Sequence, residues 1–200
     1  MTRPRDLVYI PAVIPRELSE QAFQYINSSD LAWYGPRSRT GAVKQKKMRA
    51  SFGRHEHEPA VPEVFREIGL RAIQAIEDKA RFQHEAWGDK ERALYSERIL
   101  NTLILNLYEP GDSIAAHCDP PRKDAAVLGI TFCEVPSTAR KMRFRFRKDK
   151  KRKHDVLTAD RSAYLFFGDA YSEWTHESVG SKLQKGRILS ATFRAVRESV

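Results

Sequence analysis

Apolar and polar residues alternate along the C-terminal half of the chain with the two-residue period of β-strands. This pattern predicts strands at residues 100–108, 125–134, 142–147, 155–158, 162–167 and 187–196. Before them lie a short strand at residues 6–10 and two stretches with a helical period, one entered at Pro15 and one over residues 61–82. Helices followed by six or more strands indicate an α+β chain built around an antiparallel sandwich or barrel.

The segment over residues 101–120 is unusually polar for a strand pair. A Pro110-Gly111 turn follows the first strand, and His117 and Asp119 lie two residues apart just beyond it. Residues two apart in an extended strand point the same way, so these two side chains can bind one ion. Asn106 and Tyr108 share a face of the preceding strand by the same rule. We therefore predict a lined polar cavity here.

Two protein ligands hold a catalytic metal weakly, so another part of the chain must supply a third ligand. The best candidate is His176, which lies shortly after the predicted strand at residues 162–167. Together with His117 and Asp119 it would complete the facial set of two histidines and one carboxylate that non-haem Fe(II) oxygenases use.

The composition is that of a chain able to bury a core, with 41% hydrophobic residues and a formal charge of +9. Such a charge suits a protein that meets a polyanion, most often nucleic acid, and equally one with a merely basic surface. No apolar run approaches the ~20 residues of a membrane span. The N-terminus lacks the order of a signal peptide, so we expect an intracellular protein of the cytoplasm or nucleus, without membrane contact. Cys118 and Cys133 should be reduced thiols in such a reducing compartment.

Residues 37–62 form the most basic part of the N-terminal half. Lysines and arginines surround the tripeptide Ser51-Phe52-Gly53. The Phe52 ring would either stack on a nucleobase while the cations hold phosphates, or fill a gap in the core. Residues 141–153 are also basic, and would either contact a nucleic-acid backbone or form a solvated hairpin.

Four motifs occur in order: N-x-Y-x-P-G from Asn106, H-x-D from His117, G-D-A-x-x-x-W-x-H from Gly168 and S-x-T-x-R from Ser190. In order and spacing they resemble the core of the AlkB-like Fe(II)- and 2-oxoglutarate-dependent dioxygenases. The resemblance covers most of the chain and is best from Asn106 onward. It implies a double-stranded β-helix (jelly roll) with N-terminal helices packed outside it. The expected organisation is one domain over residues 1–200, with helices and a nucleotide-recognition lid in 1–99 and the catalytic core in 100–200.

The resemblance also implies the roles of individual residues. It makes His117, Asp119 and His176 the ligands of Fe(II), with O2 and 2-oxoglutarate as the other reactants. The residues implied to contact 2-oxoglutarate are Asn106, Tyr108, Ser190, Thr192 and Arg194.

One position departs from the family pattern, because Ile188 stands where these enzymes usually have a second arginine. The adjacent Arg187 points to the opposite face of a regular strand from Arg194. Either a bulge turns Arg187 toward 2-oxoglutarate, or Arg194 holds it with only hydroxyl help.

The activity that the resemblance implies is oxidative demethylation of an N-methylated base in DNA or RNA. We expect the protein to be a monomer. The hydroxylated methyl group would leave as formaldehyde, and the base would have to leave its stack to be reached. The residues expected to contact the substrate are Lys47, Arg49, Ser51 and Phe52. Trp174 is a weaker candidate, because a large aromatic side chain beside the end of a sheet would equally be a structural residue packed in the protein.

Three alternatives stay open at this point. The same chemistry would serve oxidation of a carbon-bound methyl group, as in 5-methylcytosine, or of a protein side chain. A chain whose chemistry was lost through Ile188 would instead be a nucleic-acid-binding module.

Overall fold

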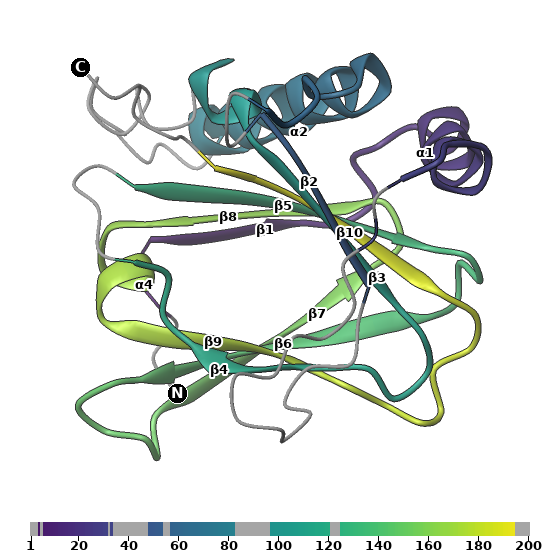
Figure 1. The fold of residues 1–200 in the computed structure, drawn as a ribbon. Helices are drawn as coiled ribbons and strands as arrows, with labels where there is room; N and C mark the ends of the chain where they lie inside the picture. The colour runs from purple at the N-terminus through teal and green to yellow at the C-terminus, as the bar shows by residue number, and fades with distance from the viewer. Residues whose placement is uncertain are drawn as a thin grey trace.

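Two antiparallel sheets face each other, and two helices cover the outer face of the larger one (Figure 1). The computed structural model describes residues 4, 6–31, 33, 48–53, 57–82, 97–120 and 125–194. The larger sheet has six strands, which in spatial order are β1 (Leu7–Ile10), β8 (Ser162–Phe167), β5 (Ala126–Cys133), β10 (Ile188–Arg194), β3 (Leu103–Tyr108) and β2 (Met48–Phe52). The smaller has four, which are β4 (Ile114–His117), β9 (Trp174–Val179), β6 (Ala139–Phe146) and β7 (Lys153–Ala159).

The helices lie where the 3.6-residue period placed them. Helix α1 spans Arg16–Ser28 and α2 spans Glu63–Phe82, while the one-turn helices η1 (Glu97–Asn101) and α4 (Gly168–Ser172) connect strands. Helix α1 begins directly after Pro15, whose fixed φ and missing N–H suit a helix start. Figure 1 shows both long helices on the same side of the six-stranded sheet, away from the four-stranded one.

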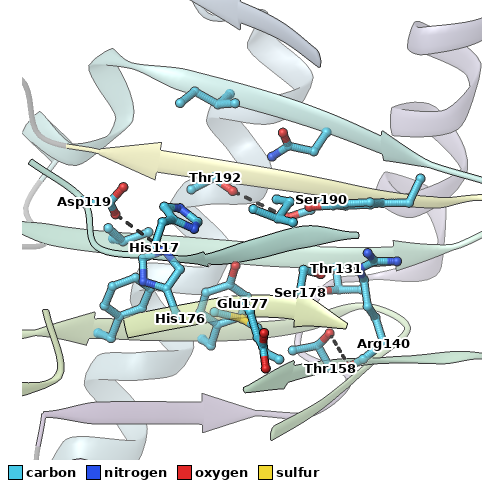
Figure 2. Close-up of a pocket in the computed structure, with 18 of the residues that line it drawn as sticks. His117, Asp119, Thr131, Arg140, Thr158, His176, Glu177, Ser178, Ser190 and Thr192 are labelled. Carbon is cyan, nitrogen blue, oxygen red and sulfur yellow. Dashed lines mark hydrogen bonds and ion pairs between the residues drawn. The ribbon is translucent and has the colours of Figure 1, made fainter. Parts of the chain in front are cut away.

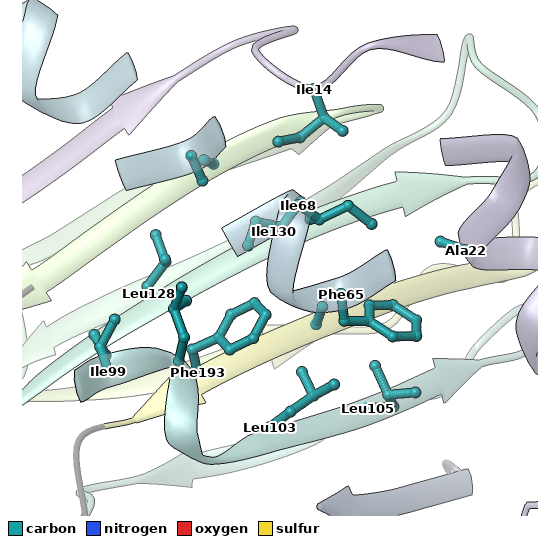
Figure 3. Packing of buried hydrophobic residues seen from close by; sticks show 14 of the residues in the cluster. Ile14, Ala22, Phe65, Ile68, Ile99, Leu103, Leu105, Leu128, Ile130 and Phe193 are labelled. Carbon is teal, nitrogen blue, oxygen red and sulfur yellow. The ribbon is translucent and has the colours of Figure 1, made fainter. Parts of the chain in front are cut away.

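The main core lies between these helices and the six-stranded sheet. Phe65 and Ile68 of α2 are fully buried against strand residues such as Leu105 and Phe193 (Figure 3). Because side chains alternate along a strand, the odd-numbered residues of β3 enter this core and the even-numbered ones face the smaller sheet. The strands β3, β5 and β8 are buried on both faces as a result.

The double-stranded β-helix with external helices, expected from the resemblance, is confirmed. Two strands were missed: β2 lies in the basic stretch over residues 37–62, where no strand was predicted, and β9 carries too weak an alternation to be recognised. Among the described residues, no helix is long and apolar enough to cross a membrane. Cys118 and Cys133 are both free thiols, as predicted.

Candidate metal centre and cavity

A cavity of about 270 Å³ lies between the two sheets, lined by side chains from both. The larger sheet contributes the residues of β3, β5, β8 and β10 that face away from the helices, Asn106, Tyr108 and Thr192 among them. The smaller sheet contributes His117, His176 and neighbouring strand residues. The lined polar cavity predicted from strand parity is therefore present.

Three metal-binding side chains converge at one end of this cavity (Figure 2). His117 ends β4 and is the direct cross-strand partner of His176 on β9, so their rings lie 4.3 Å apart between centroids. Asp119 follows two residues after His117, and its Oδ2 lies 3.8 Å from His176 Nε2. One ligand atom from each residue fits within 4.8 Å of the others, which is compact enough for a single ion.

The surroundings of the two histidines suit metal binding. His117 Nδ1 lies 2.9 Å from the Ala115 carbonyl oxygen, which can only accept, so Nδ1 is the donor and Nε2 is the nitrogen left for a metal. Burial holds the pKa of His176 well below its ordinary value, and the neighbouring His117 and Arg194 lower it further. A neutral imidazole is the form that binds a metal.

Asp119 supplies an independent test of whether these residues fit an ion. Its carboxylate is almost fully buried, and Oδ1 forms an ion pair with Arg194 Nη1 at 2.8 Å. Oδ2 has no hydrogen-bond partner within the described part of the chain. A buried carboxylate oxygen without a partner is costly, and a cation held between Asp119 and the two imidazoles would satisfy it. The cluster therefore fits a divalent ion, and its donor set is that of Fe(II) oxygenases.

The residues predicted to contact 2-oxoglutarate mostly line the cavity. Asn106, Tyr108, Ser190, Thr192 and Arg194 all do so. Ser190 Oγ and Thr192 Oγ1 lie 3.5 Å apart, as the dashed line in Figure 2 marks. Burial raises the pKa of the Tyr164 hydroxyl, and the neighbouring Ser190 and Thr192 hydroxyls offset part of this shift.

Arg187 is the exception, and of the two alternatives left open for it, the inward turn toward 2-oxoglutarate is the one that the structure contradicts. Its guanidinium forms an ion pair with Glu134 at 2.8 Å and donates to Asn27 at 3.2 Å, outside the cavity. It lies just before β10, so no bulge turns it toward Arg194.

Two of the predicted substrate contacts, Phe52 and Trp174, are buried in the structure. Phe52 is 3% exposed and packs in the main core, because the alternation of β2 turns Ala50 and Phe52 to the helices and Arg49 to the cavity. Trp174 is also buried, since it shares its inward face of β9 with His176 and packs on Phe146. Neither ring is free to stack on a base, so both assignments are corrected.

Of the remaining predicted contacts, Arg49 alone lines the cavity among the described residues. The hydroxyl of Ser51 donates to the Glu58 carboxylate at 3.1 Å. Lys47 lies outside the described residues.

Arg140 is a cavity residue that sequence reasoning missed. It is 4% exposed and faces inward from β6 beside Met142 and Phe144. The predicted strand began at Met142, two residues later. Extending the alternation back by one step would have placed an arginine on a buried face, which is a strong signal of function.

Gly129 on β5 leaves the space that Tyr164 occupies, because a Cβ at this position would overlap the Tyr164 ring. We expect Gly129→Ala to lower the free energy of unfolding by about 1–3 kcal/mol, the usual cost of overpacking. Urea denaturation measures it. In a double-mutant cycle with Tyr164→Leu, part of the cost should be recovered. Strict additivity of the two substitutions would contradict this account.

Comparisons with known proteins identify the fold. Neither a scan of protein-family models nor a search of curated proteins gives a match. Among solved structures, OsALKBH1 is similar over 97% of this chain and 99% of its own, with a TM-score of 0.67 and 13% identity. A Pseudomonas putida prolyl-4-hydroxylase is similar over 96% and 94% of the two chains, with a TM-score of 0.56 and 14% identity.

The fold and the site can be stated together. This chain has a double-stranded β-helix fold similar to that of OsALKBH1, with a His-Asp-His cluster at one end of the cavity between its two sheets. The similarity in structure agrees with the resemblance seen in the motifs.

Proposed function

We propose that this protein is an Fe(II)- and 2-oxoglutarate-dependent dioxygenase. The observation that carries the proposal is the cluster of half-buried His117 with buried Asp119 and His176, which lines a cavity between two sheets. The fold shared with OsALKBH1 and a prolyl-4-hydroxylase supports it. When bound, Fe(II) and 2-oxoglutarate would reduce O2 and supply the oxidant that inserts an oxygen atom into a C–H bond.

The chain's own residues would prepare this chemistry. His117 is oriented by its hydrogen bond to the Ala115 carbonyl, burial favours the neutral form of His176, and Asp119 is oriented by its ion pair with Arg194. Arg194 would also face the 2-oxoglutarate end nearest the metal, with Asn106 and the hydroxyls of Ser190 and Thr192 beside it.

As substrate we propose an N-methylated base in DNA or RNA. The formal charge of +9 and the motif resemblance support a polyanionic substrate. Arg49 reaches the cavity from β2, the edge strand of the larger sheet. The exposed β6–β7 turn adds cations: Lys150 and Lys151 lie there beside Lys148, which pairs with Glu173.

The test is succinate formation measured by mass spectrometry with Fe(II), ascorbate and 2-oxoglutarate. Oligonucleotides carrying 1-methyladenine, 3-methylcytosine, 6-methyladenine or 5-methylcytosine are added separately, with His176→Ala as control. Succinate that rises with one N-methylated base and disappears in the control is the expected result. A rise only with 5-methylcytosine would move the chemistry to a carbon-bound methyl. If the protein binds 2-oxoglutarate but forms no succinate with any oligonucleotide, the nucleic-acid substrate is contradicted and protein substrates are favoured.

Arg49→Ala should raise the KM for the oligonucleotide about 5- to 30-fold, the cost of losing one charged contact to phosphate or base. Slow succinate formation without oligonucleotide should stay unchanged. The matched control is Arg71→Ala on α2, an exposed arginine paired only with Glu67 at 3.6 Å in the described structure. An equal rise in KM for both variants would show a general charge effect and contradict a specific role for Arg49.

A further inference from the structure

Arg140 is a buried cation held rigidly by neutral groups. Its Nε donates to Ser178 Oγ, Nη1 to Gln184 Oε1 at 3.2 Å, and Nη2 to the Asp112 carbonyl at 2.7 Å. The guanidinium also stacks on the Tyr108 ring, 3.6 Å from its centroid. These contacts fix the plane and position of the guanidinium before any ligand arrives.

The countercharge of this cation is missing. Arg140 forms no ion pair with a carboxylate among the described residues; the nearby Asp112 carboxylate instead accepts from the Glu109 amide at 3.0 Å. A guanidinium stays protonated even where burial lowers its pKa, as it does here. A buried charge without an opposite partner is strongly unfavourable, so an anion that enters the cavity would be bound tightly.

Arg140 keeps donors for such an anion. A guanidinium has five N–H groups, and the three bonds to Ser178, Gln184 and Asp112 leave one on each terminal nitrogen. Two N–H groups are the number that one carboxylate accepts in a bidentate pair. The cavity that Arg140 lines measures about 270 Å³, which is room enough for a small organic acid.

The distance from the metal cluster suits a dicarboxylate. Ser178, which holds Arg140, lies two residues beyond His176 on β9, and both face inward. Two residues of an antiparallel strand span about 6.8 Å. Figure 2 shows the His-Asp-His cluster and Arg140 at opposite ends of the cavity. A ligand that reaches from the metal to Arg140 therefore needs an acidic group at each end of a short chain.

The apolar Ile188 on β10 accounts for the position of the cavity's buried arginine, Arg140, on β6. Ile188 pairs with Tyr108 across β10 and β3 and is fully buried in a small apolar cluster with Tyr108 and Cys133. The larger sheet thus presents apolar surface where a second arginine on β10 would stand. Arg140 enters from the opposite sheet and stacks on the Tyr108 ring of the same cluster.

We propose that Arg140 binds the distal carboxylate of 2-oxoglutarate and so selects a 2-oxo dicarboxylate over a 2-oxo monocarboxylate. The inference deepens the proposed function and rests on it. It also revises the consequence of Ile188. The arginine that binds the distal carboxylate lies on β6 and not on β10, so the 2-oxoglutarate site is complete without a second arginine on β10.

The test compares two ligands in the protein loaded with Mn(II), which prevents turnover. Calorimetry gives the Kd of 2-oxoglutarate and of 2-oxopentanoate, which has a methyl group in place of the distal carboxylate. The wild type should prefer 2-oxoglutarate by at least about 30-fold, the cost of breaking a buried charge pair. In Arg140→Met this preference should disappear, while Arg140→Lys should retain part of it because a point charge replaces the fork.

The preference is a ratio measured within each protein, so it does not depend on the folded fraction, which Mn(II) stoichiometry reports. Arg187→Met is the matched control and should keep the full preference, because Arg187 pairs with Glu134 outside the cavity. A preference that survives in Arg140→Met would overturn the inference and leave the proposed function standing. A wild type that binds Mn(II) and no 2-oxoglutarate would overturn both.

Discussion

Replacing His176 by alanine should abolish metal binding and with it all succinate formation. The side chain is buried between Asp119 and His117, so no solvent-exposed group can take its place. Loss of a direct ligand should weaken metal affinity by more than the roughly 10- to 100-fold that changes to outer-sphere partners cost. Calorimetric titration with Mn(II) measures the affinity without any need for turnover.

Metal removal should also be visible in stability. A ligand at 100 times its Kd that binds only the folded state raises the free energy of unfolding by about 2.7 kcal/mol. Mn(II) should therefore stabilise the wild type in urea and leave His176→Ala unchanged. His57→Ala is the control, since this exposed histidine lies outside the cluster, and it should behave as the wild type. Equal stabilisation of His176→Ala would mean that the ion binds elsewhere.

The metal cluster was predictable because it rests on local geometry and on a motif. His117 and Asp119 converge as their two-residue spacing predicted, even though β4 ends at His117. Asn106 and Tyr108 share the cavity face for the same reason. His176 was chosen because the metal needed a further ligand and this histidine shortly follows the predicted strand at residues 162–167, and the motif agreed. Its own strand β9 was not recognised, since its inward alternation is apolar only at Trp174.

The parts that failed depend on where strands begin and which layer covers them. Phe52 looked like a lid residue because lysines and arginines precede it, yet β2 is an edge strand whose even-numbered residues face α2. Arg140 was missed because it precedes the predicted start of its strand. Its partners Gln184 and Asp112 come from distant turns, which no pattern along one strand reveals. Tertiary layering, more than local sequence, decided these positions.

Phe65→Ala should produce the largest loss of stability that one side chain of the helical layer can cause. Phe65 is fully buried between α2 and the six-stranded sheet, and its ring meets Tyr25 of α1 edge-on at 5.6 Å. Truncating such a phenylalanine costs about 3–5 kcal/mol through lost transfer energy and the cavity left behind. Urea denaturation should show the midpoint falling accordingly, with Leu70→Ala, 39% exposed on the same helix, changing it little.

The same variant tests whether the helical face and the cavity face of the six-stranded sheet are independent. Helix α2 packs on the face opposite to the cavity, so folded Phe65→Ala should bind Mn(II) with unchanged affinity. Arg140→Met should give the reverse result, with its main effect on 2-oxoglutarate affinity. If Phe65→Ala lost metal affinity while still folded, the sheet would transmit the repacking of its outer face to His117 and His176. The independence of the two layers would then be wrong, because the helical layer would position the metal ligands as well as cover the sheet.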